Sequence, residues 1–404
     1  MLFTESKELT PIDQRAPRLA LRWFACRRSS SITRRTFAAV LALSPLLGIC
    51  GHASAGVLRI VDWNIEDDIN GATTPLPGFN TVLQGMGNEI LAGDAQPIDI
   101  MSLEETTSNS TTVAPIVADL NSDYGAGTYA MSTYQATQDG SNDEGNGPNA
   151  LVYNTTTVTL LASVGIGTPG GSSNGEYRQV VRYEFEPVGT TSVFYIYVSH
   201  MKSGSSSSDA TDRGKEATII RNDEATLPAN SSVMYMGDLN SNPPEAEFTN
   251  FTAAGQGQAF DPVNFSTSVQ YYSESATDLR YRDDYQLMTS NVLNDTGAIN
   301  YVGSTLNNFG NNGTTASEGN VDSPSTTGGS NTALNYMTIA NGYSAVAGAN
   351  NYPDQAVVLQ ALTTASDHLP NIADYTFTAV PEPTCLALLA TGASALLIRR
   401  RPRG

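Results

Sequence analysis

The sequence predicts an α/β fold built mainly as one large domain. Short apolar segments typical of strands recur along the chain, and segments with helical spacing separate them. With 404 residues, 40% hydrophobic and 8% aromatic, the chain can bury a sizeable core. Polar motifs adjoin several of the apolar segments directly. This placement indicates one rim of a sheet-based core, where functional side chains converge.

The first half of the chain alternates between strands and helices. In order, we expect a strand at 56–65, a helix at 77–91, a strand at 98–103, a helix at 113–120, and strands at 149–153, 179–185 and 192–199.

The second half continues the alternation. The best helical pattern spans 209–227, and strands are expected at 232–236, 283–288 and 372–377. An apolar strand or helix at 356–362 leads into a polar motif. Residues from about 290 to 352 are rich in Asn, Gly, Ser and Thr, and we interpret them as a long insertion, partly ordered at best, that contains a mobile loop.

The chain is strongly acidic, with a formal net charge of −19 at pH 7. Without the two terminal segments, which we expect to be removed, nine basic residues remain beside 36 acidic ones. Tight, sequence-independent binding to nucleic acid needs clustered Lys and Arg, and so few can form only a local patch. A metal site is the more natural use of the carboxylates.

Residues 1–55 have the charged, apolar and small-residue parts of a signal peptide in order, and we expect cleavage after Ala55. Arg34 and Arg35 ahead of Phe37 favour twin-arginine export, with an ordinary secretory signal as the alternative. The cysteines all fall in terminal segments, so the exported domain has no disulfide to form; they are Cys26, Cys50 and Cys385.

Residues 381–404 contain a Pro-Glu-Pro motif, a short apolar run and three consecutive arginines. This order resembles the PEP-CTERM sorting tail of Gram-negative-type bacteria, which an exosortase recognises and cuts. The resemblance implies transient anchoring and delivery to the cell surface or extracellular matrix. The apolar run is shorter than the ~20 residues that span a bilayer unaided, and a plain C-terminal anchor is the alternative.

Six polar motifs stand where apolar elements end or begin. They are Trp63-Asn64, Glu104-Glu105, Ser199-His200, Gly237-Asp238-Leu239-Asn240, Asp283-Asp284 and Ser366-Asp367-His368. The pair at 283–284 opens its strand, so it reaches the same rim if that strand runs antiparallel to the others. Alone, each motif fits a turn, a capping residue or a structural histidine. Together they predict a rim where oxygen ligands and imidazoles converge.

The order of these motifs resembles the endonuclease/exonuclease/phosphatase superfamily, which has the deoxyribonuclease I-like fold. Members present a strand-end Asn, a metal-binding Glu, a His before a polar loop, Gly-Asp-x-Asn, an Arg-x-Asp-Tyr-type strand and Ser-Asp-His-x-Pro. The resemblance covers about residues 57–377 and implies a four-layer αββα sandwich. It also implies hydrolysis of phosphate esters with Mg²⁺, or with Mn²⁺ or Ca²⁺ in its place.

Within this resemblance, Glu105 is the expected main metal ligand, with Asn64 and Asp367 nearby. A hard cation prefers carboxylate and amide oxygens, which these three side chains provide. A surface acid is the alternative interpretation of Glu105.

The remaining motif residues would act on the phosphate. Asp238 is expected to orient or deprotonate the attacking water, and Asn240 to bind a phosphoryl oxygen. His200 and His368 would approach the phosphate as imidazolium ions. Asp284 would hydrogen-bond to His368 and raise its pKa.

Two positions depart from the family pattern. Glu104 stands where Gln is usual and adds negative charge beside the metal ligand. Asp283 stands where an apolar residue is common, and we choose Asp284 as the inward-facing member of the pair. Further substrate-site candidates, each with a structural alternative, are Asn149, Tyr153 and Arg178.

The sequence therefore favours an exported, metal-dependent phosphodiesterase that hydrolyses extracellular DNA or RNA. A lipid phosphodiesterase similar to sphingomyelinases, or a phosphomonoesterase, is the alternative that the acidic surface favours. A cell-surface or matrix protein that kept the fold without the activity is a third. We expect a monomer that contacts the membrane only through its terminal anchor, with an exosortase as partner at the tail.

Overall fold

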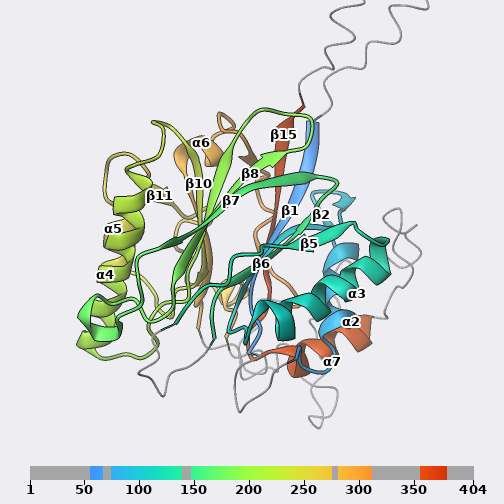
Figure 1. Cartoon of the computed structure of the whole chain (residues 1–404), viewed down its shortest axis with the longest axis horizontal. Helices are drawn as coiled ribbons and strands as arrows, with labels where there is room; N and C mark the ends of the chain where they lie inside the picture. The colour runs from blue at the N-terminus through green and yellow to red at the C-terminus, as the bar shows by residue number, and fades with distance from the viewer. Residues whose placement is uncertain (1–54, 67–73, 139–146, 275–280, 312–354, 380–404) are drawn as a thin grey trace, which may run out of the picture. The chain divides into compact units, whose positions relative to one another are not determined.

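The computed structural model describes residues 55–66, 74–138, 147–274, 281–311 and 355–379. Two β-sheets form the centre of this part of the chain (Figure 1). The expected signal peptide, except for its last residue, the expected sorting tail and residues 312–354 of the expected insertion lie outside the described residues. No helix within the described ranges has both the length and the apolar character needed to cross a membrane.

The first sheet joins strands from both ends of the described chain. Its strands, in spatial order, are β13 (Asn300–Tyr301), β15 (Asn371–Thr378), β1 (Ala55–Asn64), β4 (Ile98–Glu104), β6 (Ala150–Asn154) and β5 (Tyr129–Met131), and β14 (Asn307–Asn308) also pairs with β15. β1 runs parallel to β4 and antiparallel to β15. The end of β4 and the start of β15 therefore lie at the same rim as the end of β1.

The second sheet, like the first, contains both parallel and antiparallel strand pairs. Its strands, in spatial order, are β11 (Ala259–Phe260), β12 (Asp284–Thr289), β10 (Ser232–Asp238), β9 (Phe194–Val198), β8 (Val180–Pro187) and β7 (Val158–Ile166). β10 is parallel to β9 and antiparallel to β12, and Asp238 pairs with Asp284 in register. This confirms the antiparallel direction that the sequence required of the strand at 284–289.

Helices cover the outer face of each sheet. Those on the first sheet are α2 (Phe79–Asn88), α3 (Ala114–Tyr124), which a turn of π-helix η2 (Asn109–Val113) precedes, and α7 (Gln355–Ala365). Those on the second sheet are α4 (Ser207–Glu224) and α5 (Ala246–Thr252). Short elements complete the described chain: β2 (Ile90–Leu91), β3 (Asp94–Ala95), η3 (Gly171–Ser173), η4 (Val269–Tyr271) and α6 (Ser290–Leu293).

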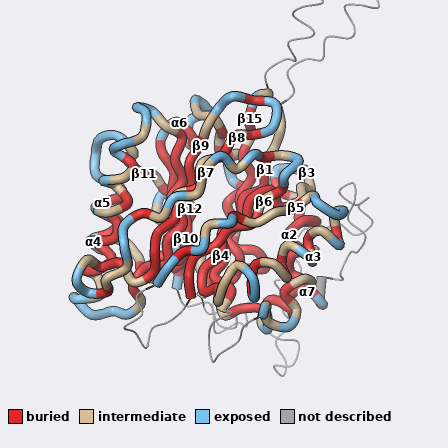
Figure 2. Tube along the Cα trace, in the orientation of Figure 1, coloured by how far each residue is buried: buried red, intermediate tan, exposed pale blue. Residues whose placement is uncertain are grey.

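Three apolar clusters hold these layers together. One lies between the first sheet and its helices, one between the two sheets, and one between the second sheet and its helices. Central strands such as β4 and β10 are buried along their whole length, as strands covered on both faces are (Figure 2). The four-layer αββα arrangement expected from the motifs is confirmed.

The helix and strand positions expected from the sequence hold to within a few residues, with some omissions. The segment at 356–362 is helical, as part of α7. β7 was missed because Leu161 and Val164 are exposed, which breaks the alternation of apolar and polar residues. The first part of the expected insertion forms α6, β13 and β14, and the latter two extend the first sheet by pairing with β15.

A buried arginine joins the first sheet to its helical layer. Arg59 of β1 is fully buried and bonds to both carboxylate oxygens of Asp374 on β15, at 2.9 and 3.1 Å. Its Nη1 also donates to the carbonyl oxygens of Met86 and Glu89, at 2.7 and 2.8 Å, where α2 ends. The guanidinium thus satisfies a strand carboxylate and two carbonyl groups at a helix end, none of which reaches water.

Replacing this arginine should destabilise the fold strongly. Arg59→Met leaves the Asp374 carboxylate and two carbonyls buried without their partner, which costs about 3–5 kcal/mol in the free energy of unfolding. Lys215→Met is the control, because Lys215 is 40% exposed in its ion pair with Asp212 and its loss should cost under about 1 kcal/mol. Urea unfolding of both variants measures the difference, and equal losses would contradict the role given to Arg59.

Candidate active site

The predicted motifs meet at one rim of the two sheets. Asn64 ends β1 and lies opposite Glu104, the last residue of β4, while Asp238 ends β10 beside Asp284 at the start of β12. His200 lies two residues after the end of β9. The parallel and antiparallel pairings therefore bring these strand ends to one place, as the sequence predicted.

Asn64 links the two sheets at this rim. Its Nδ2 donates to Glu105 Oε1 and to Asp238 Oδ2, both at 3.0 Å. Its Oδ1 accepts from the backbone nitrogen of Glu66 at 3.1 Å. Because the amide nitrogen faces the carboxylates, Asn64 positions Glu105 and Asp238 here and does not present its oxygen as the metal ligand that we expected.

The backbone at two motif residues takes the left-handed conformation. Glu105 has φ of 57° and Asn240 has φ of 52°, which costs a side-chain-bearing residue conformational energy and is often retained at functional sites. Gly237 has φ of 135°, and a Cβ there would lie 1.8 Å from the carbonyl oxygen of Ser199. Glycine before Asp238 thus allows the end of β10 to approach the Ser199-His200 segment closely.

Asp284 and His368 form the predicted hydrogen bond. His368 Nδ1 lies 2.8 Å from Asp284 Oδ2, although 84 positions separate the two residues. His368 Nε2 faces Asp238 Oδ2 at 3.8 Å and Asp367 Oδ1 at 3.9 Å. Burial lowers the pKa of His368, but these carboxylates, led by Asp284, outweigh it and raise that pKa well above its usual value. His368 is therefore an imidazolium ion at neutral pH.

His200 differs from its expected charge state. Its Nε2 lies 3.4 Å from Asp238 Oδ2 and 3.7 Å from Glu105 Oε1, so it reaches the expected place. Burial, followed by the positive charges of Arg178 and His368, lowers the pKa of His200 well below its usual value. We expected two imidazolium ions from the sequence; the structure favours a neutral imidazole at His200, because the ring is buried beside other cations.

Asp238 is suited to proton transfer. Burial, with repulsion from Asp284 and Glu105, raises its pKa to about 7, against the opposing effects of His368 and Asn64. A carboxylate with a pKa near the working pH is an effective general base. Asn240 donates its backbone N–H to Asp238 Oδ1 at 2.8 Å, and its Nδ2 to the Met201 carbonyl at 3.2 Å.

The donor set fits a divalent cation. Ligand atoms of Glu105, His200 and Asp238 lie within 4.8 Å of one another, and those of Glu274, Asp367 and His368 form a second such group. Burial and mutual repulsion raise the pKa of Asp367 and of its neighbour Glu66. Carboxylates gathered in this way favour a bound cation, and oxygen-rich sites suit Mg²⁺, Mn²⁺ or Ca²⁺.

Two of these acids were missed from the sequence. Glu66 accepts the backbone N–H of Asp367 at 3.0 Å, and its place two residues after Asn64 was an available signal. Glu274 lies in an irregular segment, and an isolated bridge between backbones 94 positions apart brings it to His368. Spacing along the chain gives no sign of that contact.

Glu104 lies in a separate acidic group behind the site. Asp62, Glu104 and Asp284 are fully buried, with ligand oxygens within 4.8 Å of one another. Burial and repulsion from Asp62 raise the pKa of Glu104 well above its usual value. The raised pKa favours the protonated form of Glu104, which would reduce the extra negative charge expected beside Glu105.

The three low-ranked substrate candidates are held by the protein. Asn149 is buried and its Nδ2 donates to the carbonyls of Gln179 and Val198, which ties β6 to the second sheet. Arg178 is buried, and its Nη1 donates to the carbonyls of His200 and Met201 at 3.4 and 3.2 Å. Tyr153 packs against Phe185 between the sheets, toward the far end of β6, so the structure does not bring it to the rim.

The chain resembles a known protein family in sequence and several solved structures in fold. The sequence model described as Endonuclease/Exonuclease/phosphatase family matches residues 63–368. Searching the curated protein sequences gives no match. Among solved structures, the human Nocturnin catalytic domain with bound sulfate anion is 17% identical over 81% of this chain and 97% of that chain, with a TM-score of 0.46. D. rerio TDP2 complexed with single strand DNA product is 13% identical over 79% of this chain and 99% of that chain, with a TM-score of 0.45. A Bacteroides thetaiotaomicron mannosyl-6-phosphatase is 12% identical over 79% of this chain and 100% of that chain, with a TM-score of 0.42.

The two site histidines should titrate on opposite sides of the ordinary range. In metal-free protein followed by NMR, His368 should stay protonated as the pH rises through its usual pKa, because its raised pKa holds the proton. His200 should stay neutral as the pH falls through the same range, and His52 gives the third resonance. Asp284→Asn should lower the pKa of His368. Ordinary titration of both site histidines would contradict the arrangement described.

Proposed function

The chain belongs to the endonuclease/exonuclease/phosphatase family, whose members hydrolyse phosphate esters, and we propose that it is a divalent-metal-dependent phosphoesterase. The observation that carries this proposal is the convergence at one rim of two groups. Glu105, His200 and Asp238 lie within 4.8 Å of one another, and the hydrogen-bonded pair of Asp284 and His368 faces them. Hydrolysis of a phosphate ester needs a base for water, a cation and a donor to the phosphoryl group. These residues provide the base, the donor and ligands that would hold the cation.

The cation belongs at the acidic part of the rim. Glu105, with Glu66 and Asp367, would hold it, because their charges act on one another across this space. When bound, the ion neutralises charge on the phosphoryl oxygens and polarises the ester. Asn64 keeps Glu105 in place by donating to its Oε1.

The protein's own groups then move the protons. Asp238, with a pKa of about 7 and held by Asn64 and Asn240, takes the proton from the attacking water as the water oxygen bonds to phosphorus. The bond from phosphorus to the ester oxygen breaks in the same displacement, and the leaving oxygen takes up a proton from solvent. The His368 imidazolium, fixed by Asp284, donates from Nε2 toward the phosphoryl oxygens and favours the charge that develops on them. The Asn240 amide retains a second N–H that can bind a phosphoryl oxygen.

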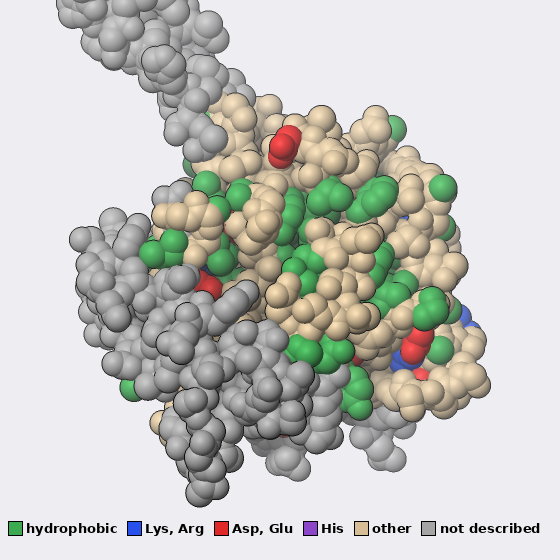
Figure 3. Space-filling model, turned by 180° about the vertical axis from the view of Figure 1, so that it is seen from behind, with side chains coloured by type: hydrophobic (Ala, Val, Ile, Leu, Met, Phe, Trp, Pro, Cys, Tyr) green, Lys and Arg blue, Asp and Glu red, His purple; other side chains and the backbone are tan. Residues whose placement is uncertain are grey.

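Extracellular DNA or RNA is the first candidate substrate that the sequence favours. The basic residues in the described part of the chain offer few contacts to such a polyanion. All eight are buried or paired with an acid: Arg59, Arg178, Arg182, Lys202, Arg213, Lys215, Arg221 and Arg282. Lys and Arg side chains are correspondingly sparse on the face shown in Figure 3. A polyanion gains most of its affinity from unpaired cations, so nucleic acid would have to bind largely through the active site itself.

A small phosphate ester is the second candidate, favoured by this pairing of the basic residues. Such a substrate needs only the rim residues and the cation. A lipid phosphodiesterase finds less support, because the large apolar side chains exposed in the described part are scattered. They are Leu161, Val164, Val188, Tyr281 and Val357.

Hydrolysis should require a divalent cation that Glu105 helps to bind. Plasmid DNA, RNA, sphingomyelin and chromogenic phosphomono- and diesters, assayed with Mg²⁺ and with excess EDTA, separate the candidates. Millimolar Mg²⁺ should also raise the melting temperature, since only the native state binds it. Glu105→Gln should abolish both effects, while the control Glu186→Gln, at the far end of β8, should keep them. Full activity in EDTA would refute the proposal.

Asp284 and His368 should act as one unit. Asp284→Asn and His368→Ala should each lower kcat at least ~10²-fold, and the double variant should be little worse than the poorer single variant. Asp283→Asn is a matched control. Burial raises the pKa of Asp283 to about 10, so its carboxyl is neutral at pH 7 and an amide preserves its charge.

Circular dichroism and melting temperature should show that all four variants fold. Losses that multiply in the double variant would mean that Asp284 and His368 act independently. A loss in Asp283→Asn as large as that in Asp284→Asn would contradict the choice of Asp284 as the partner of His368.

A further inference from the structure

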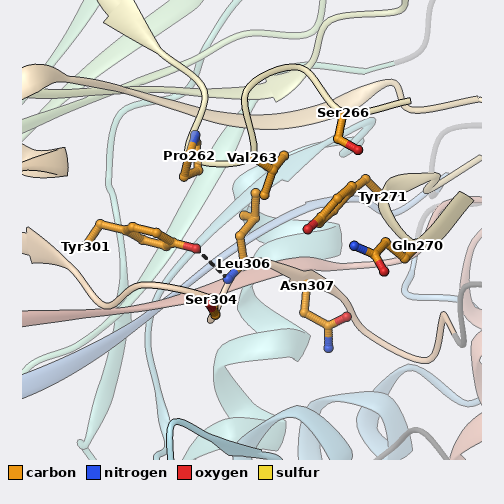
Figure 4. A pocket seen from close by; sticks show the side chains of 9 residues that line it. All are labelled: Pro262, Val263, Ser266, Gln270, Tyr271, Tyr301, Ser304, Leu306 and Asn307. Carbon is orange, nitrogen blue, oxygen red and sulfur yellow. Dashed lines mark hydrogen bonds between the residues drawn. The ribbon is translucent and has the colours of Figure 1, made fainter. Parts of the chain in front are cut away.

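A cavity of about 450 Å³ lies where the edges of the two sheets meet (Figure 4). The loop after β11, the edge strand of the second sheet, forms one side. The segment from β13 to β14, at the edge of the first sheet, forms another, and η4 closes the cavity between them. The lining residues are Pro262, Val263, Ser266, Gln270, Tyr271, Tyr301, Ser304, Leu306 and Asn307. None of them belongs to the active site described above.

The lining is polar but uncharged. Six of the nine side chains carry hydroxyl or amide groups, and the other three are apolar. No acid or base is among these nine lining side chains, although the chain has a formal net charge of −19. A phosphate or carboxylate would find no cation in this lining, and a metal ion would find no carboxylate. The cavity therefore suits a neutral ligand with many hydrogen-bonding groups.

Two tyrosines reach into the cavity from opposite sides, with their hydroxyl ends toward each other (Figure 4). The Tyr301 hydroxyl accepts the backbone N–H of Leu306 at 3.1 Å, which fixes that ring. The Tyr271 ring packs against the Arg282 guanidinium, 5.5 Å from the ring centroid, and Arg282 is itself held by Asp261. Both rings are thus positioned before any ligand binds, which lowers the entropic cost of binding.

The cavity also offers unused hydrogen-bonding groups beside an apolar floor. Within the described residues, the Tyr271 hydroxyl and the Gln270 amide make no side-chain hydrogen bond. Val263, Tyr301 and Leu306 pack onto the apolar cluster between the two sheets. A ligand that presents hydroxyls at its edge and C–H groups on its face would meet both kinds of surface.

We propose that this cavity binds a neutral saccharide of one or two rings. A sugar ring has hydroxyl groups around its edge and apolar C–H groups on its faces, and it carries no charge. Its size agrees with the cavity, since pockets of about 300–1,000 Å³ hold small molecules. The cavity lining shares no residue with the phosphoesterase rim, and binding of a sugar there does not depend on the reaction proposed at the rim.

Saturation-transfer NMR and calorimetry with the full chain in EDTA test this assignment. The probes are glucose, N-acetylglucosamine, cellobiose and N,N′-diacetylchitobiose, with glucuronate as the charged counterpart of glucose. At least one neutral probe should bind at millimolar concentration. Glucuronate should bind at least about tenfold more weakly than glucose, because no cation replaces the water around its carboxylate.

Variants locate the binding. Tyr271→Ala and Gln270→Ala should each weaken the neutral probe about tenfold, because each removes a ring or a donor from the lining. Leu161→Ala, on β7 at the opposite edge of the second sheet, is the control and should bind as the wild type does. Unchanged melting temperatures establish that the variants fold. No binding by any neutral probe, equal binding of glucuronate, or unchanged affinity in both cavity variants would overturn the proposal.

Discussion

Several carboxylates are buried close together where the strands end at the active-site rim. The rim depends on the groups that compensate this negative charge. Glu105, Asp238 and Asp284 come from three strands in two sheets, and each is almost fully buried. Carboxylates in such surroundings must bind protons, cations or hydrogen-bond donors. The rim uses all three kinds of compensation: the His368 imidazolium for Asp284, the Asn64 amide for Glu105 and Asp238, and a raised pKa for Asp238 itself. The divalent cation that we propose would supply the positive charge that these groups leave unmet.

The sandwich makes this arrangement possible because both sheets end at the same rim. Asn64 belongs to the first sheet and Asp238 to the second, and their hydrogen bond joins the two where the apolar cluster between them stops. Within the first sheet, Arg59 compensates a buried charge in the same way. It pairs with the Asp374 carboxylate and donates to a carbonyl oxygen at the end of α2. Other large buried arginines are likewise paired with acids, Arg213 with Glu247 and Arg282 with Asp261. In the part of the chain that the structure describes, these pairs leave few Lys and Arg side chains free for contact with a polyanion.

Much of the fold and site was predictable from the sequence, because the polar residues of the site stand next to apolar strand segments along the chain. Asn64, Glu105, His200 and Asp238 each adjoin an apolar segment, and parallel strands necessarily bring such ends together. The contact between Asp284 and His368 was predictable only from the family resemblance. The contacts of Glu274 and Arg178 were not predictable. Each involves backbone groups of a segment distant in sequence, which the spacing of residues along the chain does not indicate. The neutral state of His200 depends on burial and on neighbouring cations, which a sequence does not display.

In the proposed active site, a divalent cation binds at Glu105 and a phosphate lies opposite His368. A crystal structure of the protein with Mn²⁺ and inorganic phosphate tests it most directly, because the anomalous signal of Mn²⁺ locates the ion independently of refinement. We expect an anomalous peak about 2.1 Å from a carboxylate oxygen of Glu105, the usual distance of such ions from oxygen ligands, with a phosphate between the ion and His368 Nε2. A peak only at sites away from Glu105, or a phosphate that binds without contact to this rim, would contradict it.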